Sequence, residues 1–213
     1  DKDSMKKLGL KNVILLEITL LIILFSALFV STDIASAKEV KGSKDGTAVQ
    51  IQSLMQREVD SLDKKIVARE IKIKEAIEKK ERETQSKRED LVTYAKQFIG
   101  NPYVLGGRSL TNGCDCASYV TIIYRNFGYN WQFGSVSTLL KNCGGREVSI
   151  SELKEGDIIF FGNLDHVAIY SGNGMIVHAM DEQHGIRETK LFPSGGTHTY
   201  SGKGINTIRR IFE

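Results

Sequence analysis

The 213-residue sequence has little cysteine, proline or tryptophan: it contains three Cys, two Pro and one Trp. Three cysteines are too few for a dense disulfide scaffold, and a chain of this length can bury a core without such crosslinks. The formal net charge is only +3, which is too weak an excess to predict nucleic-acid binding. The sequence also lacks a glycine-rich nucleotide or dinucleotide motif. These absences argue against a disulfide-rich module, a nucleic-acid-binding protein and a nucleotide-binding fold.

Long apolar runs are also scarce, and the one that exists lies near the N-terminus. Residues 13–30 form an apolar run interrupted by Glu17. Lys6, Lys7 and Lys11 precede the run, and Ala35-Ser36-Ala37 follows it. A basic start, an apolar stretch and a small-x-small end are typical of an export signal. We therefore predict that residues 1–37 are a signal peptide or membrane anchor. Residues 1–4, ahead of Met5, are interpreted as additions to the native start.

The length of this apolar run leaves two interpretations open. Its uninterrupted part, residues 18–30, has signal-peptide length, whereas the whole run is nearly long enough to span a bilayer. The small residues favour cleavage after Ala37; without cleavage, the segment would anchor the chain with its C-terminus outside. Both interpretations predict export, either to the cell wall and extracellular space or to the outer face of the cytoplasmic membrane.

Residues 38–89 are predicted to form a polar linker followed by a charged helix, because the stretch from 50 to 90 contains neither Gly nor Pro. Apolar residues recur there at alternating steps of four and three, a heptad-like pattern. These residues are Met55, Val59, Leu62, Ile66, Ile73 and Ala76, with Arg69 at one position of the series. One interpretation is a coiled coil that self-associates or docks on an envelope machine. We favour a solvated helical stalk, because the series is short and imperfect.

Residues 90–213 are predicted to be one compact domain, because glycines become frequent, strand patterns appear and the length suits a domain. After Cys116, five apolar residues share one helical face: Tyr119, Val120, Ile123, Tyr124 and Phe127. Gly128 is a stop signal. A buried helix is therefore expected to begin at or near Cys116. The dipole and free N–H groups of a helix N-terminus stabilise negative charge, so we expect a lowered pKa and a nucleophilic thiolate.

A predicted β-hairpin carries two histidines that are candidate partners of this thiol. His166 opens an apolar strand, Gly172-Asn173-Gly174 follows as a turn, and His178 lies on the returning strand. A two-residue turn would put the histidines on opposite faces, whereas a three-residue loop puts both on one face, with residue 168 opposite residue 178. We predict the three-residue loop, with Gly174 in a left-handed conformation. His166 could then serve as the base, and His178 could orient its ring.

Simpler interpretations of these residues stay open at this stage. A cysteine at a helix start is more often structural than catalytic, and a strand histidine is usually a satisfied core residue. Cys114, Cys116 and the two histidines would also suit zinc, although a Cys-x-Cys pair opening a buried helix is an unusual spacing for a structural zinc site. A disulfide between Cys114 and Cys143 is open as well, and an odd number of cysteines in an exported chain predicts at least one free thiol.

In these motifs and their order, residues 90–213 resemble the NlpC/P60 family of papain-like peptidases. Residues 101–107 resemble the family's "PYxxGG" element, 115–118 its "DCSG" nucleophile motif, 153–161 its "LxPGDLVFF" strand, 166–170 its "HVGIY" strand, 176–179 the strand with the third polar residue, and 209–211 the closing strand. The departures are Glu155 in the proline position and Ala117-Ser118 in place of Ser-Gly.

The resemblance implies an α+β, papain-like fold in which the Cys-bearing helix packs on a small antiparallel sheet. It implies that Cys116 is the nucleophile, His166 the base and His178 the orienting residue, with no metal or organic cofactor. The substrate-binding positions carried over are Tyr103, Asp115 and Ser118.

The activity implied by the resemblance is cleavage of amide bonds in the stem peptides of peptidoglycan, commonly a γ-D-glutamyl bond to the diamino acid. A related amidase or acyltransferase with the same triad is one alternative, and a non-catalytic wall-binding or assembly module is another. The expected partners are peptidoglycan stem peptides and not nucleic acid. The membrane, through residues 1–37, and a second copy or an envelope machine, through the stalk, are the further partners considered.

Overall fold

The computed structural model describes residues 45–193 and 202–213, with side chains from residue 49 onward. The predicted signal peptide or anchor, residues 1–37, lies outside these residues. Contacts divide the chain between Glu75 and Ala76 into two units, which we describe separately. Among the described residues, no helix is long and apolar enough to cross a membrane.

Helix α2 (Asp45–Lys96) is 52 residues long. It begins inside the segment predicted to be linker, residues 38–50, so the prediction of a non-helical linker is wrong from Asp45 onward. Neither glycine nor proline occurs between Gly46 and Lys96, so no residue of these types interrupts the helix before its end. No side chain between residues 49 and 83 is buried. Leu62 and Ile66 of the heptad-like series are each 48% exposed.

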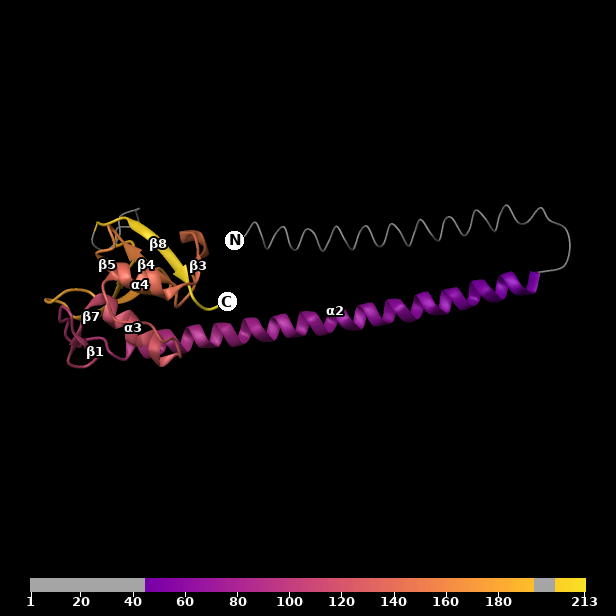
Figure 1. Ribbon diagram of the computed structural model, residues 1–213, viewed down its shortest axis with the longest axis horizontal. Helices are drawn as coiled ribbons and strands as arrows, with labels where there is room; N and C mark the ends of the chain where they lie inside the picture. Colours follow the sequence, from indigo (N-terminus) through magenta and orange to yellow (C-terminus); the bar gives the residue numbers. More distant parts are fainter. Residues whose placement is uncertain (1–44, 194–201) are drawn as a thin grey trace. The chain divides into compact units, whose positions relative to one another are not determined.

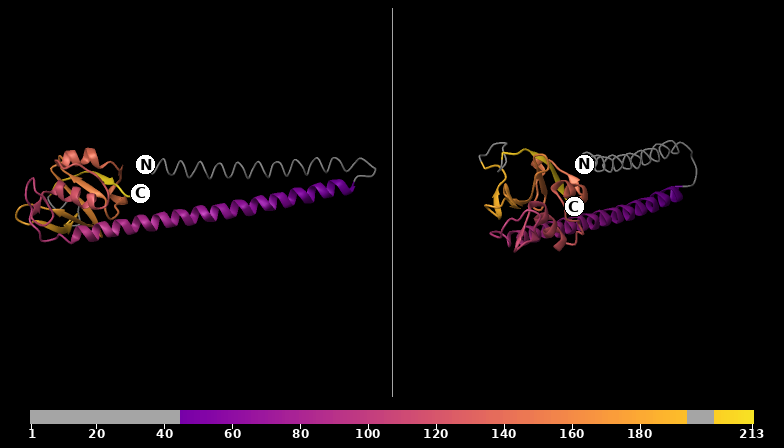
Figure 2. Two further views of the ribbon diagram at one scale, coloured as in Figure 1. Left: turned by 60° about the horizontal axis from the view of Figure 1, so that its bottom comes forward. Right: turned by 60° about the vertical axis from the view of Figure 1, so that its left-hand side comes forward.

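The C-terminal turns of α2 belong to the compact unit, as the views in Figure 2 show. Leu91, Val92 and Ala95 are buried in its core. Arg88 is also buried, at 3% exposure, so the packed domain begins slightly before the expected boundary at residue 90. The helix is continuous through that boundary, which explains why composition alone places it only approximately.

The compact unit is built on a six-stranded sheet in the order β3-β8-β4-β5-β6-β7, with every neighbouring pair antiparallel. Strands β3, β8, β4, β5 and β7 of this sheet are labelled in Figure 1. The strands are β3 (Arg146–Glu147), β4 (Ile158–Phe161), β5 (His166–Gly172), β6 (Met175–Ala179), β7 (Ile186–Lys190) and β8 (Ile205–Arg210). The other elements are the strand pair β1 (Arg108–Ser109) and β2 (Gly113–Cys114), helices α3 (Cys116–Asn126) and α4 (Val136–Cys143), and the 3-10 turn η2 (Ile150–Glu152).

The alternation of side chains along the strands divides the core in two. Ile158, Phe160, Val167 and Val177 pack with α3, α4 and the end of α2, whereas alternate residues such as Ile159 form a smaller cluster on the other face. Helix α3 packs against β5 and β6. The expected α+β arrangement, with the Cys-bearing helix on an antiparallel sheet, is confirmed.

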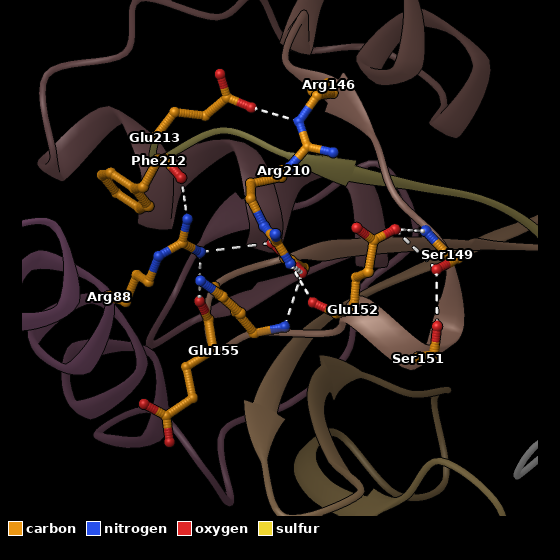
Figure 3. A network of polar contacts seen from close by, with 12 residues as sticks. Arg88, Arg146, Ser149, Ser151, Glu152, Glu155, Arg210, Phe212 and Glu213 are labelled. Carbon is orange, nitrogen blue, oxygen red and sulfur yellow. Dashed lines mark hydrogen bonds and ion pairs between the residues drawn. The ribbon is translucent and has the colours of Figure 1, made fainter. Parts of the chain in front are cut away.

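A buried ionic network joins α2 to the sheet (Figure 3). Asp157 is fully buried, and its carboxylate accepts hydrogen bonds from Arg210 Nη2 at 2.7 Å and Nε at 3.0 Å, with Arg88 Nη1 at 3.5 Å. Both guanidinium groups also donate to main-chain oxygens, Arg88 to Phe212 and Arg210 to Glu152. The carboxylate therefore compensates two buried positive charges on elements that are far apart in the sequence.

Candidate active site

Helix α3 begins at Cys116, as predicted, because Asp115 caps it. Asp115 has an extended backbone, and its Oδ1 accepts the N–H of Ser118 at 2.7 Å, which satisfies one of the free donors of the first turn. Its Oδ2 accepts the N–H of Gly106 at 3.0 Å. One carboxylate thus fixes both the start of α3 and the preceding loop. Cys116 is the first residue of the helix and lies where the two meet.

The loop before α3 folds tightly on itself. Tyr103 forms an isolated bridge with Cys114, and a Cβ added at Gly107 would lie 2.4 Å from the Gly113 carbonyl oxygen. Glycine at 107 is therefore required by close packing within the loop. Burial, together with negative charge at Cys116 and Asp115, raises the pKa of Tyr103 to about 12. Tyr103 therefore lies in the electrostatic surroundings of the thiol.

The hairpin confirms the predicted register but reaches it by a different turn. Ile169 pairs with Val177, so residue 168 lies opposite His178, and Gly174 is left-handed with φ of 72°. The predicted three-residue loop is wrong. Gly172 pairs with Met175, so the turn has two residues, and the register shifts between Tyr170 and Gly172. The extra residue is a β-bulge in β5, which shifts the register by one just as a longer loop would.

The two histidines lie on one face and contact each other. His166 Nε2 is 2.8 Å from His178 Nδ1, and His178 Nε2 is 3.0 Å from Thr189 Oγ1 on β7. Burial lowers the pKa of His166 to about 4, with nearby Lys203 adding to the effect. Burial likewise lowers the pKa of His178 to about 3, and His166 contributes. Both rings are therefore neutral at pH 7.

The thiol lies beside the first residues of β5. Cys116 is 6% exposed, and the backbone N–H of Val167, the residue after His166, is close enough to stabilise a thiolate at Cys116. Burial and the charge of Asp115 raise the pKa of Cys116 to about 11, although hydrogen bonds from Val167 and the first residues of α3 act in the opposite direction. The expected lowering of the thiol pKa is wrong here, because desolvation outweighs the helix N-terminus.

An open cleft of about 610 Å³ lies beside Tyr103 and His166, whereas Cys116 and His178 are not among its lining residues. Its lining includes Tyr103, Asp165, His166, Asp181, Glu182 and Lys203. Lys203 pairs with Asp165 at 2.6 Å, and Asp181 pairs with His184 at 2.7 Å. Tyr103 and His166 thus lie where a substrate could enter. Asp115 is engaged as the helix cap, and Ser118 is buried at 3% exposure; neither lines this cleft.

Comparison with known proteins matches this domain to a family. The family model for "NlpC/P60 family" covers residues 100–203, a range that contains Cys116 and both histidines. This domain belongs to the NlpC/P60 family.

Relatives of the NlpC/P60 domain include named peptidases. The chain is 30% identical over 125 residues to the gamma-D-glutamyl-L-lysine dipeptidyl-peptidase of Bacillus cereus, a match covering 54% of this chain and 35% of the relative. It is 35% identical over 135 residues to the peptidoglycan DL-endopeptidase CwlO of Bacillus licheniformis, covering 59% of this chain and 28% of the relative. The chain therefore spans about a third of the length of these relatives.

A solved structure shares the fold. The crystal structure of an NlpC/P60 family protein from Bacillus cereus superposes with a TM-score of 0.51 and 26% sequence identity, covering 59% of this chain and 40% of that chain. This similarity supports the papain-like, α+β architecture of the compact unit.

Metal and disulfide interpretations of the cysteines find no support in the described residues. Residues 45–193 and 202–213 contain no group of three or more His, Cys, Asp or Glu side chains placed to hold a metal ion. Cys114, Cys116 and Cys143 are all buried free thiols. The zinc alternative and the bridge between Cys114 and Cys143 are therefore not seen in this NlpC/P60 domain.

Sequence reasoning did not identify Thr189 or the charged cleft residues. Thr189 lies eleven positions after His178, and only the β6–β7 register brings the two together: His178 pairs with Arg187, and Thr189 lies two residues further along β7 on the same face. The charges of the cleft come from loop residues without a periodic pattern. The one sequence feature that could have indicated Thr189 is its place on a short strand. Threonine is common in strands, so this feature does not predict a partner for His178.

Proposed function

We propose that this NlpC/P60 domain is a cysteine peptidase that cleaves amide bonds in the stem peptides of peptidoglycan. The observation that carries the proposal is the thiol of Cys116 at the start of α3, near the backbone N–H of Val167, the residue after His166, whose ring contacts His178 at 2.8 Å. A buried thiol next to an oriented imidazole is the arrangement that nucleophilic acyl transfer requires.

The mechanism starts from a neutral thiol and a neutral imidazole. His166 accepts the Cys116 proton as the sulfur attacks the amide carbonyl carbon, and the resulting imidazolium protonates the leaving amine. Water then attacks the thioester with His166 again as the base, which releases the acyl group and restores the thiol. The free N–H groups at the start of α3 are available to stabilise the oxyanion.

The bond we propose is the γ-D-glutamyl bond to the diamino acid of the stem. The B. cereus relative is named for a gamma-D-glutamyl-L-lysine substrate, and the B. licheniformis relative for peptidoglycan. The lining of the cleft includes both signs of charge, Lys203 as well as Asp181 and Glu182, which suits a stem that carries carboxylates and an amine. An amidase or acyltransferase would need the same thiol, so the products distinguish them.

The site of action follows from this substrate. We propose that the chain is exported and that residues 1–37 act as a signal peptide, or as an anchor if they are retained. N-terminal sequencing of the protein recovered from the cell envelope decides between the two. A mature chain starting at Lys38 supports cleavage, whereas one that retains the apolar segment supports anchoring.

We also propose that α2 pairs with a second copy of itself, which is the coiled-coil alternative to the solvated stalk that the sequence favours. In the exposed series, Val59, Ile66 and Ile73 are spaced by seven residues and share one core position of the heptad. Met55 and Leu62 share the other core position. Residues such as Leu62 and Ile66 are about half exposed on the single helix. β-branched residues at one core position of the heptad with leucine at the other favour a parallel two-stranded coiled coil.

The activity is tested by digesting purified peptidoglycan with the full chain and identifying the products by mass spectrometry. Cys116→Ala removes the nucleophile, and Cys143→Ala is a matched control because it removes another buried thiol. Release of stem fragments by the wild type and Cys143→Ala, but not by Cys116→Ala, is expected. Equal release by Cys116→Ala would refute the proposal, and binding without release would favour a wall-binding module. A fragment starting at residue 90 is unsuitable because it lacks Arg88.

A further inference from the structure

Three side chains on adjacent strands form a line of hydrogen bonds at the proposed site. His166 on β5 contacts His178 on β6 through Nε2 and Nδ1 at 2.8 Å, and His178 Nε2 lies 3.0 Å from Thr189 Oγ1 on β7. His178 is fully buried, and Thr189 is half-buried at the outer end of the line. Thr189 therefore forms the partly exposed end of this line, and His166, the proposed base, forms the other end.

We propose that Thr189 is a positioning residue: its hydroxyl accepts a hydrogen bond from His178 Nε2–H and so selects the tautomer of both imidazole rings. This inference rests on the proposed peptidase function only for its catalytic consequence. The tautomers themselves are a property of the folded domain, and they can be measured whether or not a substrate is known.

The direction of one hydrogen bond decides the protonation of the whole line, because each neutral imidazole carries a single N–H. If Thr189 accepts from His178 Nε2–H, then His178 Nδ1 must accept from His166 Nε2–H. The hydrogen of His166 then lies on Nε2, and its Nδ1 has a lone pair that can take the proton of Cys116. If Thr189 instead donated to His178, both ring hydrogens would move to Nδ1, and His166 could not act as the base.

The surroundings of Thr189 allow its hydroxyl to accept. Within residues 45–193 and 202–213, the Thr189 side chain hydrogen-bonds to His178 and to no other residue. A hydroxyl has two acceptor lone pairs and a hydrogen that rotates freely, so its own hydrogen can point to water at this half-buried position. The accepting direction also suits the proposed chemistry, since it leaves His166 Nδ1 as an acceptor for the proton of the neutral thiol.

The test combines long-range ¹H–¹⁵N NMR of the imidazole rings with kinetics on the full chain. Thr189→Val keeps the shape but removes the hydroxyl, Thr189→Ser restores it, and Thr207→Val removes a threonine hydroxyl elsewhere in the same sheet, on β8. We expect Nε2–H tautomers for His166 and His178 in the wild type, Thr189→Ser and Thr207→Val. We expect mixed tautomers in Thr189→Val, with kcat/KM lower by roughly ten- to a hundredfold, as for other residues that orient a functional histidine through its second nitrogen.

Two outcomes would overturn the proposal. One is a wild-type spectrum with the His166 hydrogen on Nδ1, which needs no variant and holds even if Thr189→Val fails to fold. The other is a folded Thr189→Val with wild-type tautomers and wild-type kcat/KM. If no variant, wild type included, cleaves peptidoglycan, the peptidase proposal fails, yet the NMR spectra still decide the role of Thr189.

Discussion

Replacing Asp157 by Asn should destabilise the domain far more than the loss of an ordinary hydrogen bond. Asp157 is fully buried between Arg88 and Arg210, which are 3% and 5% exposed. Its two oxygens receive both guanidinium groups and the N–H of Lys154 at 2.8 Å. Asparagine keeps the size but removes the charge, so two buried cations lose their counterion, and the new NH₂ group faces other donors. Breaking such a pair costs about 3–5 kcal/mol.

That loss is a large share of the total stability of a small domain, which is about 5–15 kcal/mol. The assay is urea unfolding of the full chain followed by tryptophan fluorescence, since Trp131 is buried in the core of this domain. The surface pair Lys79–Glu83, with side chains 74% and 60% exposed, is the control, and Glu83→Gln should change the stability by less than about 1 kcal/mol. The reasoning is refuted if Asp157→Asn costs no more than that control.

Three further predictions follow from the site and from α2. Burial lowers the pKa of His166 and His178 from 6.5 to about 4 and about 3, so the unfolded state binds more protons than the folded state below pH 6.5. The free energy of unfolding should therefore fall by about 3–4 kcal/mol between pH 7 and pH 5. In urea titrations, His178→Asn should remove about half of this pH dependence. The kcat/KM profile should show an acid limb near pH 4, where His166 gains a proton, and a basic limb near pH 11, where Cys116 loses its own; a profile that already falls between pH 6 and 8 would contradict both values. Oxidation should crosslink Leu62→Cys between two copies but not Lys64→Cys, which lies outside the apolar series, as judged by non-reducing electrophoresis; equal crosslinking of both would exclude the parallel pairing.

The sequence predicted those parts of the site that depend on local signals. The helix start at Cys116 was expected from the apolar face that follows it, whereas the Asp115 cap that fixes this start was found only in the structure. The shared face of His166 and His178 follows from strand alternation, although a β-bulge and a two-residue turn replaced the expected three-residue loop. A sequence pattern predicts which residues share a face of the sheet more readily than it predicts the turn or β-bulge that sets the register.

The parts that could not be predicted depend on contacts between distant segments. Arg88 reads as one of many charges on a solvated helix, yet it is buried against Asp157, 69 positions away in the chain. Thr189 becomes relevant only once β7 is placed beside β6. The pKa of Cys116 was expected to fall because the helix N-terminus is visible in the sequence, whereas the extent of burial, which raises it, is not.

The measurement that tests the central claim most directly is the trapping of the acyl-enzyme. The full chain is mixed with a defined peptidoglycan stem peptide, quenched in acid within the first turnover, and digested for mass spectrometry. We predict a thioester adduct on the peptide that contains Cys116, with the mass of the N-terminal part of the stem, and its release by hydroxylamine. Cleavage of the stem by Cys116→Ala, or an adduct mapped only to another residue, would contradict the account.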